Sequence, residues 1–366
     1  MTTVLKAAVI GTGVISKEHL SFLAASPHAR LVGVCDLSRA AARYAAQRYG
    51  ADAPYTDFNQ MLAEAQPDVV HILTPPQSHK FIATACLKAG AHVICEKPIA
   101  SNYQDFQELW AVAQECDRAL IEDQNYRFNE PILAIHDLVT QGKLGQIEEI
   151  EVRMSLGLRG GGRFADENLP SPIHQMPAGV IHDLITHLVY LALPYLPSFD
   201  YIRATWNNHG GGDLFKYDDL DALVIGDNVH ARFRFSCTTM PEGFHFRVRG
   251  TAGYAETDLF QPYIRAVYPR GGKQLSPLVN HWCNGLDLMK ASVRNFRRKI
   301  MQRTPYEGLK ILLDRTYTAL INGTPLPISY DDMERTSRLI DALVAEDNQR
   351  SMTPTWHPPR WGSDRR

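Results

Sequence analysis

Long apolar runs are missing from this chain of 366 residues, and so is any strong excess of charge of one sign. Without a run of about 18 consecutive apolar residues, a membrane-spanning helix is not expected. The formal net charge of −2 gives no general attraction to nucleic acid. The first residues, MTTVLKAAVIGTG, lack the basic segment and cleavage site of a secretory signal. We therefore expect a cytoplasmic protein with no membrane or nucleic-acid partner.

Cysteine is also scarce, and its six copies include no Cys-x-x-Cys pair. Several of them lie in apolar runs, where a cysteine behaves as a small hydrophobic residue. Reduced thiols in the cytosol fit this pattern better than a disulfide framework does.

Strand and helix signals alternate over the first third of the chain. Short apolar runs are separated by segments in which apolar residues recur with helical spacing. One of these helical segments has a candidate N-cap in Ser38 and a candidate stop in Gly50. Strands separated by helices form parallel sheets with crossover connections, so an α/β domain is predicted. The expected strands are residues 4–10, 30–36, 67–75, 92–95 and 118–123.

A glycine pair interrupts the first strand–helix junction in the segment VIGTGVIS, residues 9–16. Gly11 permits a tight turn, and Gly13 lets a pyrophosphate approach the backbone at a helix N-terminus. Asp36 ends the second strand, where a carboxylate can accept hydrogen bonds from the ribose hydroxyls of NAD. An alternative role for Asp36 is to cap the following helix. Arg39 lies close by, so NAD is expected as the cofactor while NADP stays open.

The segment CEKP follows the fourth strand and raises the question of what Lys97 is for. The carboxyl ends of parallel strands share one rim, so Lys97 is expected near the glycine loop. Pro98 restricts Lys97 to an extended backbone, and a cis bond between them would fix its direction further. On this dipeptide alone, a solvated lysine would remain the better interpretation.

Several segments together resemble the Gfo/Idh/MocA family of oxidoreductases over roughly residues 4–150, namely GTGVIS, VCD, TPPQSH, AGAHVICEKPIA and NYRFNEP. The resemblance implies a Rossmann NAD(P)-binding domain at residues 1–124. It also implies an α+β substrate-binding and oligomerisation domain at 125–350, with a large open, mostly antiparallel sheet, in a homodimer or homotetramer. We expect residues 351–366 to form a loose tail. The implied cofactor contacts are Gly11, Gly13, Val14, Ile15, Asp36, Thr74, Pro75, His79, Glu96 and Lys97.

The second half of the chain agrees with a change of architecture. Residues 145–157 alternate polar and apolar side chains, and later strand-like runs follow one another without helices between them. This order favours an antiparallel or mixed sheet. A closing helix is expected at 330–349, with Asp331 and Glu334 at capping-box spacing.

A second chemical pattern is the helical segment PAGVIHDLITHLVYLAL at residues 177–193. Asp183 and His187 are four residues apart and share one helix face. The family has an Asp-x-x-x-His pair on such a helix, so the resemblance implies that His187 is the general acid/base and that Asp183 binds substrate or orients the histidine. A neutral imidazole suits proton removal near neutral pH, and a lysine near the same oxygen would stabilise a developing alkoxide. The family usually has glycine where this chain has Ile185, which puts the pocket shape in doubt.

Other interpretations stay open for several residues. A surface pair is the alternative for Asp183 and His187, and a metal site would need His182 as well. Positions 182 and 187 lie roughly 140° apart around a helix, so no metal is expected. Basic residues cluster at 290–303, which usually forms a solvated face but could contact a phosphorylated substrate or a membrane surface. Candidate substrate residues are Lys97, Arg127, Arg159, His174, Asp183 and His187, with Arg163 and Asp166 as weaker candidates.

These patterns lead to one functional hypothesis and two rivals. The hypothesis is an NAD(P)-dependent oxidoreductase that transfers hydride between nicotinamide and a hydroxyl or carbonyl carbon of a sugar, cyclitol or polyol derivative. The first rival is a redox-neutral hydrolase or lyase that recycles a tightly bound NAD. The second is a non-catalytic NAD-binding sensor.

Overall fold

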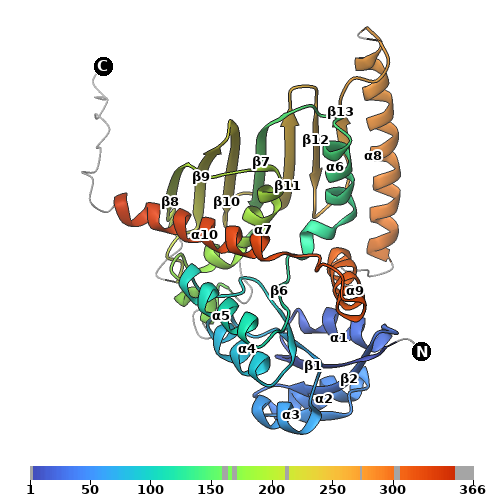
Figure 1. Ribbon diagram of the computed structural model, residues 1–366. Coiled ribbons are helices and arrows are strands. Elements are labelled where there is room, and N and C mark those ends of the chain that lie inside the picture. The colour runs from blue at the N-terminus through green and yellow to red at the C-terminus, as the bar shows by residue number, and fades with distance from the viewer. Residues whose placement is uncertain are drawn as a thin grey trace.

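The computed structural model describes residues 3–158, 164–166, 171–210, 214–272, 274–300 and 306–350. Two β-sheets dominate it, and Figure 1 shows the first in the lower part of the view and the second above it. Each sheet is covered by helices and carries its own cluster of buried apolar residues. None of the described helices combines the length and the apolar character needed to cross a membrane.

The first sheet has six parallel strands in the order β3-β2-β1-β4-β5-β6. The order reverses between β1 and β4, the switch point at which doubly wound sheets bind ligands. This confirms the predicted α/β architecture. Its strands are β1 (Leu5–Ile10), β2 (Ala29–Cys35), β3 (Ala53–Tyr55), β4 (Val69–Ile72), β5 (His92–Cys95) and β6 (Leu120–Glu122). Its helices are α1 (Ser16–Ala25), α2 (Arg39–Tyr49), α3 (Phe58–Ala65), α4 (His79–Lys88) and α5 (Tyr103–Glu115).

The predicted cap and stop of α2 are confirmed. The Ser38 side chain accepts a hydrogen bond from the Ala41 amide, and Gly50 has the left-handed conformation, with φ of 73°. Strand β3 escaped the sequence analysis because it has only three residues, one of them proline.

The second sheet has seven strands in the order β13-β12-β11-β7-β10-β9-β8. Only β7 and β10 pair in parallel, so the prediction of a mostly antiparallel sheet is confirmed. Its strands are β7 (Ile147–Ser155), β8 (Tyr201–Asn207), β9 (Asp219–Gly226), β10 (Val229–Ser236), β11 (Gly243–Gly250), β12 (Tyr254–Asp258) and β13 (Arg265–Val267).

Helix α7 (Val180–Ala192) lies against one face of the second sheet, and nearly every side chain along it is buried. Helices α6 (Glu130–Thr140) and α10 (Tyr330–Arg350) contribute to the same core. The opposite face carries charged side chains that pair across strands, such as Arg232 with Asp221 and Arg265 with Glu256. Among the described residues, the helices therefore cover one side of this sheet and leave the other side open.

The last helices do not all belong with the second sheet. Helix α9 (Glu307–Asn322) packs Leu309, Leu313 and Tyr317 into the core of the first sheet. Helix α8 (Ser276–Ile300) stands beside β13 at the edge of the second sheet (Figure 1).

The expected capping box of α10 is wrong by two residues. The reciprocal bonds join Ser329 and Asp332: the Ser329 amide donates to the Asp332 carboxylate at 2.9 Å, and the Asp332 amide donates to the Ser329 hydroxyl at 3.1 Å. Glu334 instead accepts a hydrogen bond from the Tyr103 hydroxyl on α5.

Candidate active site

The glycine loop between β1 and α1 has the backbone geometry that a dinucleotide requires. Gly11 has φ of 96°, and a Cβ atom there would lie 2.7 Å from the carbonyl oxygen of Leu73, which directly follows β4. No side chain can occupy that position without displacing β4. A Cβ atom at Gly13, in contrast, would have no other atom within 4 Å. The loop therefore leaves room at Gly13 for a pyrophosphate beside the N-terminus of α1.

Asp36 ends β2 beside this loop. Its Oδ2 accepts hydrogen bonds from the Thr12 amide at 2.8 Å and the Thr12 hydroxyl at 2.6 Å, and its Oδ1 accepts from the Ser38 amide. The side-chain cap of α2 is Ser38, so capping does not explain the carboxylate. Arg39 lines a neighbouring hollow with Tyr55. Asp36 thus connects the glycine loop to the segment before α2, and an adenosine ribose would lie beside these two segments.

We expect Asp36→Asn to weaken discrimination between NAD and NADP. Removing the negative charge weakens hydrogen bonds to the ribose and lifts the repulsion of a 2′-phosphate. The loss of a charged hydrogen bond predicts a rise of roughly tenfold or more in the KM for NAD. Steady-state kinetics with both cofactors measure this, and Asp52→Asn is the matched control because Asp52 pairs with Arg30 on the surface. An unchanged ratio of the two kcat/KM values would show that Asp36 serves the loop alone.

Lys97 meets α7 across the junction between the two sheets. Its Nζ lies 2.9 Å from Oδ1 of Asp183 and donates to the Asp183 carbonyl oxygen at 3.2 Å. The two side chains are 11% and 8% exposed, so the pair is shielded from solvent. The Lys97–Pro98 bond is cis, as the sequence allowed. The structure thus brings together the two chemical patterns that were separate in the sequence.

His187 lies one turn further along α7 and is held by a buried hydrogen-bond network. Its Nδ1 is 2.8 Å from the Tyr190 hydroxyl, which in turn donates to Oδ1 of Asn125 at 3.1 Å. Because the single hydroxyl proton points to Asn125, the Tyr190 oxygen accepts from Nδ1–H of His187. This tautomer leaves Nε2 of His187 with a free lone pair.

Burial lowers the pKa of His187 well below its ordinary value, and the positive charge of Lys97 lowers it further. The imidazole is therefore neutral at physiological pH. A neutral imidazole with a free Nε2 is the form that accepts a proton.

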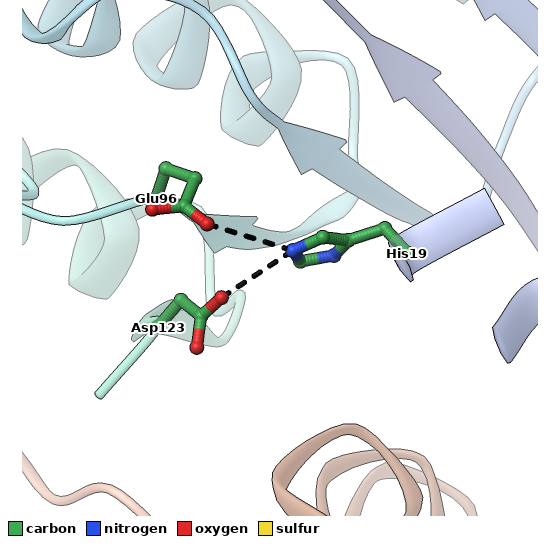
Figure 2. A group of neighbouring side chains, drawn as sticks. All are labelled: His19, Glu96 and Asp123. Atoms are coloured by element: carbon green, nitrogen blue, oxygen red, sulfur yellow. Dashed lines mark ion pairs between the residues drawn. The ribbon is translucent and has the colours of Figure 1, made fainter. Parts of the chain in front are cut away.

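Glu96, the neighbour of Lys97, belongs to a buried ion cluster that the sequence analysis missed. Figure 2 shows the His19 imidazole pointing between the carboxylates of Glu96 and Asp123, with Nε2 at 3.7 Å and 3.3 Å from their nearest oxygens. Burial opposes a charge on His19, but its contacts with the two carboxylates prevail and raise its pKa to about 9. A buried imidazolium thus neutralises Glu96 directly behind Lys97.

The same imidazole continues into the first core. Its Nδ1 lies 2.9 Å from Nδ1 of His71, whose Nε2 lies 3.0 Å from the Tyr317 hydroxyl on α9. Burial, followed by the charge of His19, lowers the pKa of His71, so His71 is neutral and accepts from His19. The sequence signal for this cluster was a histidine three residues after the start of α1, which has no meaning until β4 and β6 are placed beside it.

Gly13, Glu96, Lys97, Asp183 and His187 line one cleft, whose volume is about 460 Å³. Both halves of the chain line it. The lining residues include Gly13, Val14, Ile15, Thr74, Pro75, Glu96, Lys97, Asn125, Tyr126, Phe164, Ser171, Ile173, Asp183, His187, Phe260 and Tyr306. Among them, Asn125, Tyr126, Phe260 and Tyr306 were not candidates from the sequence, because only folding brings their segments to the rim.

Three sequence candidates lie elsewhere. His79 is fully buried and contacts the carbonyl oxygens of Thr74 and Pro98, so it joins two rim loops. Arg127 pairs with Asp332 of α10 at 2.7 Å, away from the cleft. His174 packs edge-on against Phe215, with a ring-centroid distance of 5.5 Å, and does not line the cleft. Arg159 and Arg163 lie outside the described residues.

The metal alternative on α7 gains no support from the geometry. Across the described ranges, the group whose ligand atoms lie close enough to share an ion is His19, Glu96 and Asp123, which includes neither His182 nor His187. Asp183 and His187 have Lys97 and Tyr190 as their partners.

The residues 5–124 match the family model described as "Oxidoreductase family, NAD-binding Rossmann fold", GFO_IDH_MocA. Residues 5–124 are thus similar to the Gfo/Idh/MocA oxidoreductases, the resemblance that the sequence motifs indicated. The description of that family names NAD as the nucleotide it binds.

The alignments with curated relatives are longer than the region matched by the family model. The chain is 34% identical over 198 residues to an uncharacterised oxidoreductase of Schizosaccharomyces pombe. The aligned region covers 52% of this chain and 53% of that protein. It is 30% identical over 203 residues to D-glucoside 3-dehydrogenase of Escherichia coli, covering 55% and 56%. The chain thus spans about half the length of the curated relatives it matches.

Solved structures share the whole fold. A levoglucosan dehydrogenase in complex with NADH and L-sorbose superposes with a TM-score of 0.79 at 18% identity, covering 94% of this chain and 97% of the other. An oxidoreductase from Agrobacterium radiobacter in complex with NAD+, L-tartaric acid and magnesium gives a TM-score of 0.77 at 18% identity, again over 94% and 97%. At this identity the similarity establishes the fold.

Proposed function

We propose that the protein is an NAD-dependent oxidoreductase that moves a hydride between nicotinamide and a hydroxyl-bearing carbon of a sugar, cyclitol or related polyol. The observation that carries the proposal is the 2.9 Å contact between Lys97 and Asp183. It joins the loop after β5 of the first sheet to α7, and both residues line the same cleft as Gly13. The relatives named as glucoside and inositol dehydrogenases support this substrate class.

The cofactor fits the residues present. Gly11 and Gly13 leave the backbone of the loop accessible, and Asp36 stands at the end of β2 where a ribose is read. When bound, NAD would accept or supply the hydride. The protein would position the reacting groups and provide the charged side chains around them.

Lys97 and His187 have different roles at the substrate oxygen: one stabilises its charge and the other transfers its proton. The Lys97 ammonium stabilises negative charge on that oxygen as the carbon loses hydride. His187 Nε2 takes the hydroxyl proton, and Tyr190 holds the ring in the tautomer that can accept it. In the reverse direction the same imidazole returns the proton.

Asp183 has a role different from orienting the histidine. Its carboxylate pairs with Lys97, so it fixes the direction of the ammonium and supplies a carboxylate to a substrate hydroxyl. The semi-exposed aromatic rim formed by Phe164 and Tyr306 gives a polyol an apolar surface to pack against. A small cleft lined by a lysine, an aspartate and a histidine suits an uncharged polyhydroxy compound.

An absorbance screen tests the proposal. Purified protein is mixed with NAD or NADP and a panel of sugars, cyclitols and polyols, and the NADH band is followed. We expect net NADH formation with at least one member, faster with NAD. Tight retention of NAD through purification with substrate turnover but no net NADH would instead indicate the recycling hydrolase or lyase, and NAD binding without any turnover would indicate a sensor.

A further inference from the structure

Helix α8 turns its apolar side toward solvent. Among its exposed apolar residues, Trp282 is 72% exposed, Phe296 66% and Met289 63%. A surface helix normally directs its apolar stripe to the core of its own chain. Continuous exposed apolar surfaces mark interaction sites. The outward stripe comprises Leu275, which directly precedes α8, and Val279, Trp282, Leu286, Met289, Val293, Phe296 and Ile300; Leu278 and Leu288 of α8 are exposed as well.

The inward side of α8 is polar and explains why the helix is oriented this way. Asn280 donates to the Tyr268 carbonyl oxygen at 2.9 Å, Asn284 accepts from the Ala266 amide at 3.1 Å, and Asn295 donates to the Pro262 carbonyl oxygen at 3.0 Å. Ala291 is the small residue that packs closely between them, with 4% exposure. These bonds hold the helix along the edge of the sheet, where Figure 1 shows it beside β13.

The basic residues of α8 also take defined positions. Arg294 pairs with Glu130 at 2.8 Å, and Arg298 reaches both Glu130 and Glu307. These acids come from α6 and α9, so Arg294 and Arg298 are held by carboxylates of their own chain.

The apolar stripe repeats with the spacing of a coiled coil. Starting from Leu275, its residues follow at intervals of 4, 3, 4, 3, 4, 3 and 4. This alternation of 4 and 3 is the heptad pattern, which keeps a stripe facing a second helix along its length. In heptad terms Val279, Leu286, Val293 and Ile300 take the a positions, and Leu275, Trp282, Met289 and Phe296 take the d positions.

We propose that α8 binds α8 of a second copy of this chain in an antiparallel two-helix coiled coil. A two-fold axis between residues 287 and 288 pairs every a residue with a d residue of the partner helix. The sizes are complementary in this register, because Trp282 meets a valine at position 293 and Phe296 meets a valine at position 279. Leu286 then meets Met289, and Leu275 meets Ile300.

Charge decides the direction of the two helices. The C-terminal half of α8 holds all of its cations, at Lys290, Arg294, Arg297, Arg298 and Lys299. Residues 275–289 contain no lysine or arginine and one acid, Asp287. A parallel pair would place the two basic halves side by side, whereas the antiparallel pair lays each against a half without cations. The helix dipoles favour the same arrangement.

A membrane surface is the competing occupant for an apolar stripe flanked by cations. Two observations favour a second copy. The heptad pattern matches a helix partner, and Arg294 and Arg298 are engaged by acids of their own chain instead of flanking the stripe. The open face of the second sheet, by contrast, carries the cross-strand ion pairs described above.

Sedimentation velocity of the full chain tests the assignment. We expect the wild type to have about twice the mass of the Trp282→Glu/Met289→Glu variant at micromolar concentration, with unchanged circular dichroism because both side chains point to solvent. Leu223→Glu is the control, since Leu223 is exposed on the open sheet face. Equal masses of wild type and the α8 variant, or loss of mass only in Leu223→Glu, would overturn the proposal.

Cross-linking tests the direction of the helices. In the antiparallel register, position 290 of one helix flanks Cys283 of the other, and in a parallel pair the two positions lie a full heptad apart. Lys290→Cys should therefore give a covalent dimer on mild oxidation, and Lys290→Cys/Cys283→Ser should give markedly less. No covalent dimer, or a monomer that sediments with vesicles of anionic lipid, would contradict the assignment.

Discussion

Replacing Lys97 with methionine should lower kcat by roughly 10²–10³-fold, the range seen when one group that stabilises developing oxyanion charge is removed. Methionine keeps the length of the side chain and removes the ammonium that contacts Asp183 at 2.9 Å. The loss should fall on kcat with NAD binding retained, because the glycine loop and Asp36 remain. Stopped-flow hydride transfer and fluorescence titration with NADH measure the two quantities separately.

The matched control for this change is Lys80→Met. Lys80 also contacts two carboxylates, Asp105 and Glu108, but it lies on α4 outside the cleft. Its variant should keep kcat within about twofold, as surface ion pairs contribute little. If Lys97→Met and Lys80→Met behaved alike, the contact between Lys97 and Asp183 would be structural.

Replacing His187 with glutamine should lower kcat/KM for alcohol oxidation by roughly 10²–10⁴-fold, since this removes the proton acceptor. The amide can still bond the Tyr190 hydroxyl, so the fold should persist. His182→Gln is the control: His182 is on the same helix, buried, and does not line the cleft. A drop of similar size in both variants would assign the effect to helix packing.

The pH profile separates the chemistry of His187 from a packing effect. Burial and the charge of Lys97 lower the pKa of His187 well below 6.5. The neutral form is the active one in oxidation, so kcat/KM of the wild type should stay level from pH 8 down through 6.5 and fall only in more acidic solution. The residual activity of His187→Gln should lack that acidic limb. A wild-type limb centred at the ordinary pKa of histidine would indicate that His187 is exposed to solvent.

The first domain was readable from sequence because local and global patterns agree there. The run around Ser38 and Gly50 gave a helix with its cap and stop, and the run before Lys97 gave a buried strand. The edge strand β3 has three residues and no such pattern. The parallel pairing of β7 with β10 was equally hidden, because it joins strands that are separated by α7 and two further strands.

The site was only partly predictable, for a related reason. Spacing along one helix placed Asp183 and His187 together, but it could not show that Asp183 faces Lys97 and that His187 faces Tyr190. The same limit applies to His19, which acquires its partners from β5 and β6. Arg127 acquires Asp332 of α10 as a partner, which its own segment could not reveal. The domain boundary at residue 124 and the cytoplasmic location stay predictions.

The central claim is that the ammonium of Lys97 and the imidazole of His187 act on one oxygen beside a single nicotinamide. A crystal structure of the protein with NADH and a polyol found in the screen tests it most directly. The account predicts the pyrophosphate against Gly13 and one substrate oxygen within hydrogen-bond reach of both Lys97 Nζ and His187 Nε2. A dinucleotide bound away from the glycine loop, or a substrate oxygen that meets neither side chain, would contradict it.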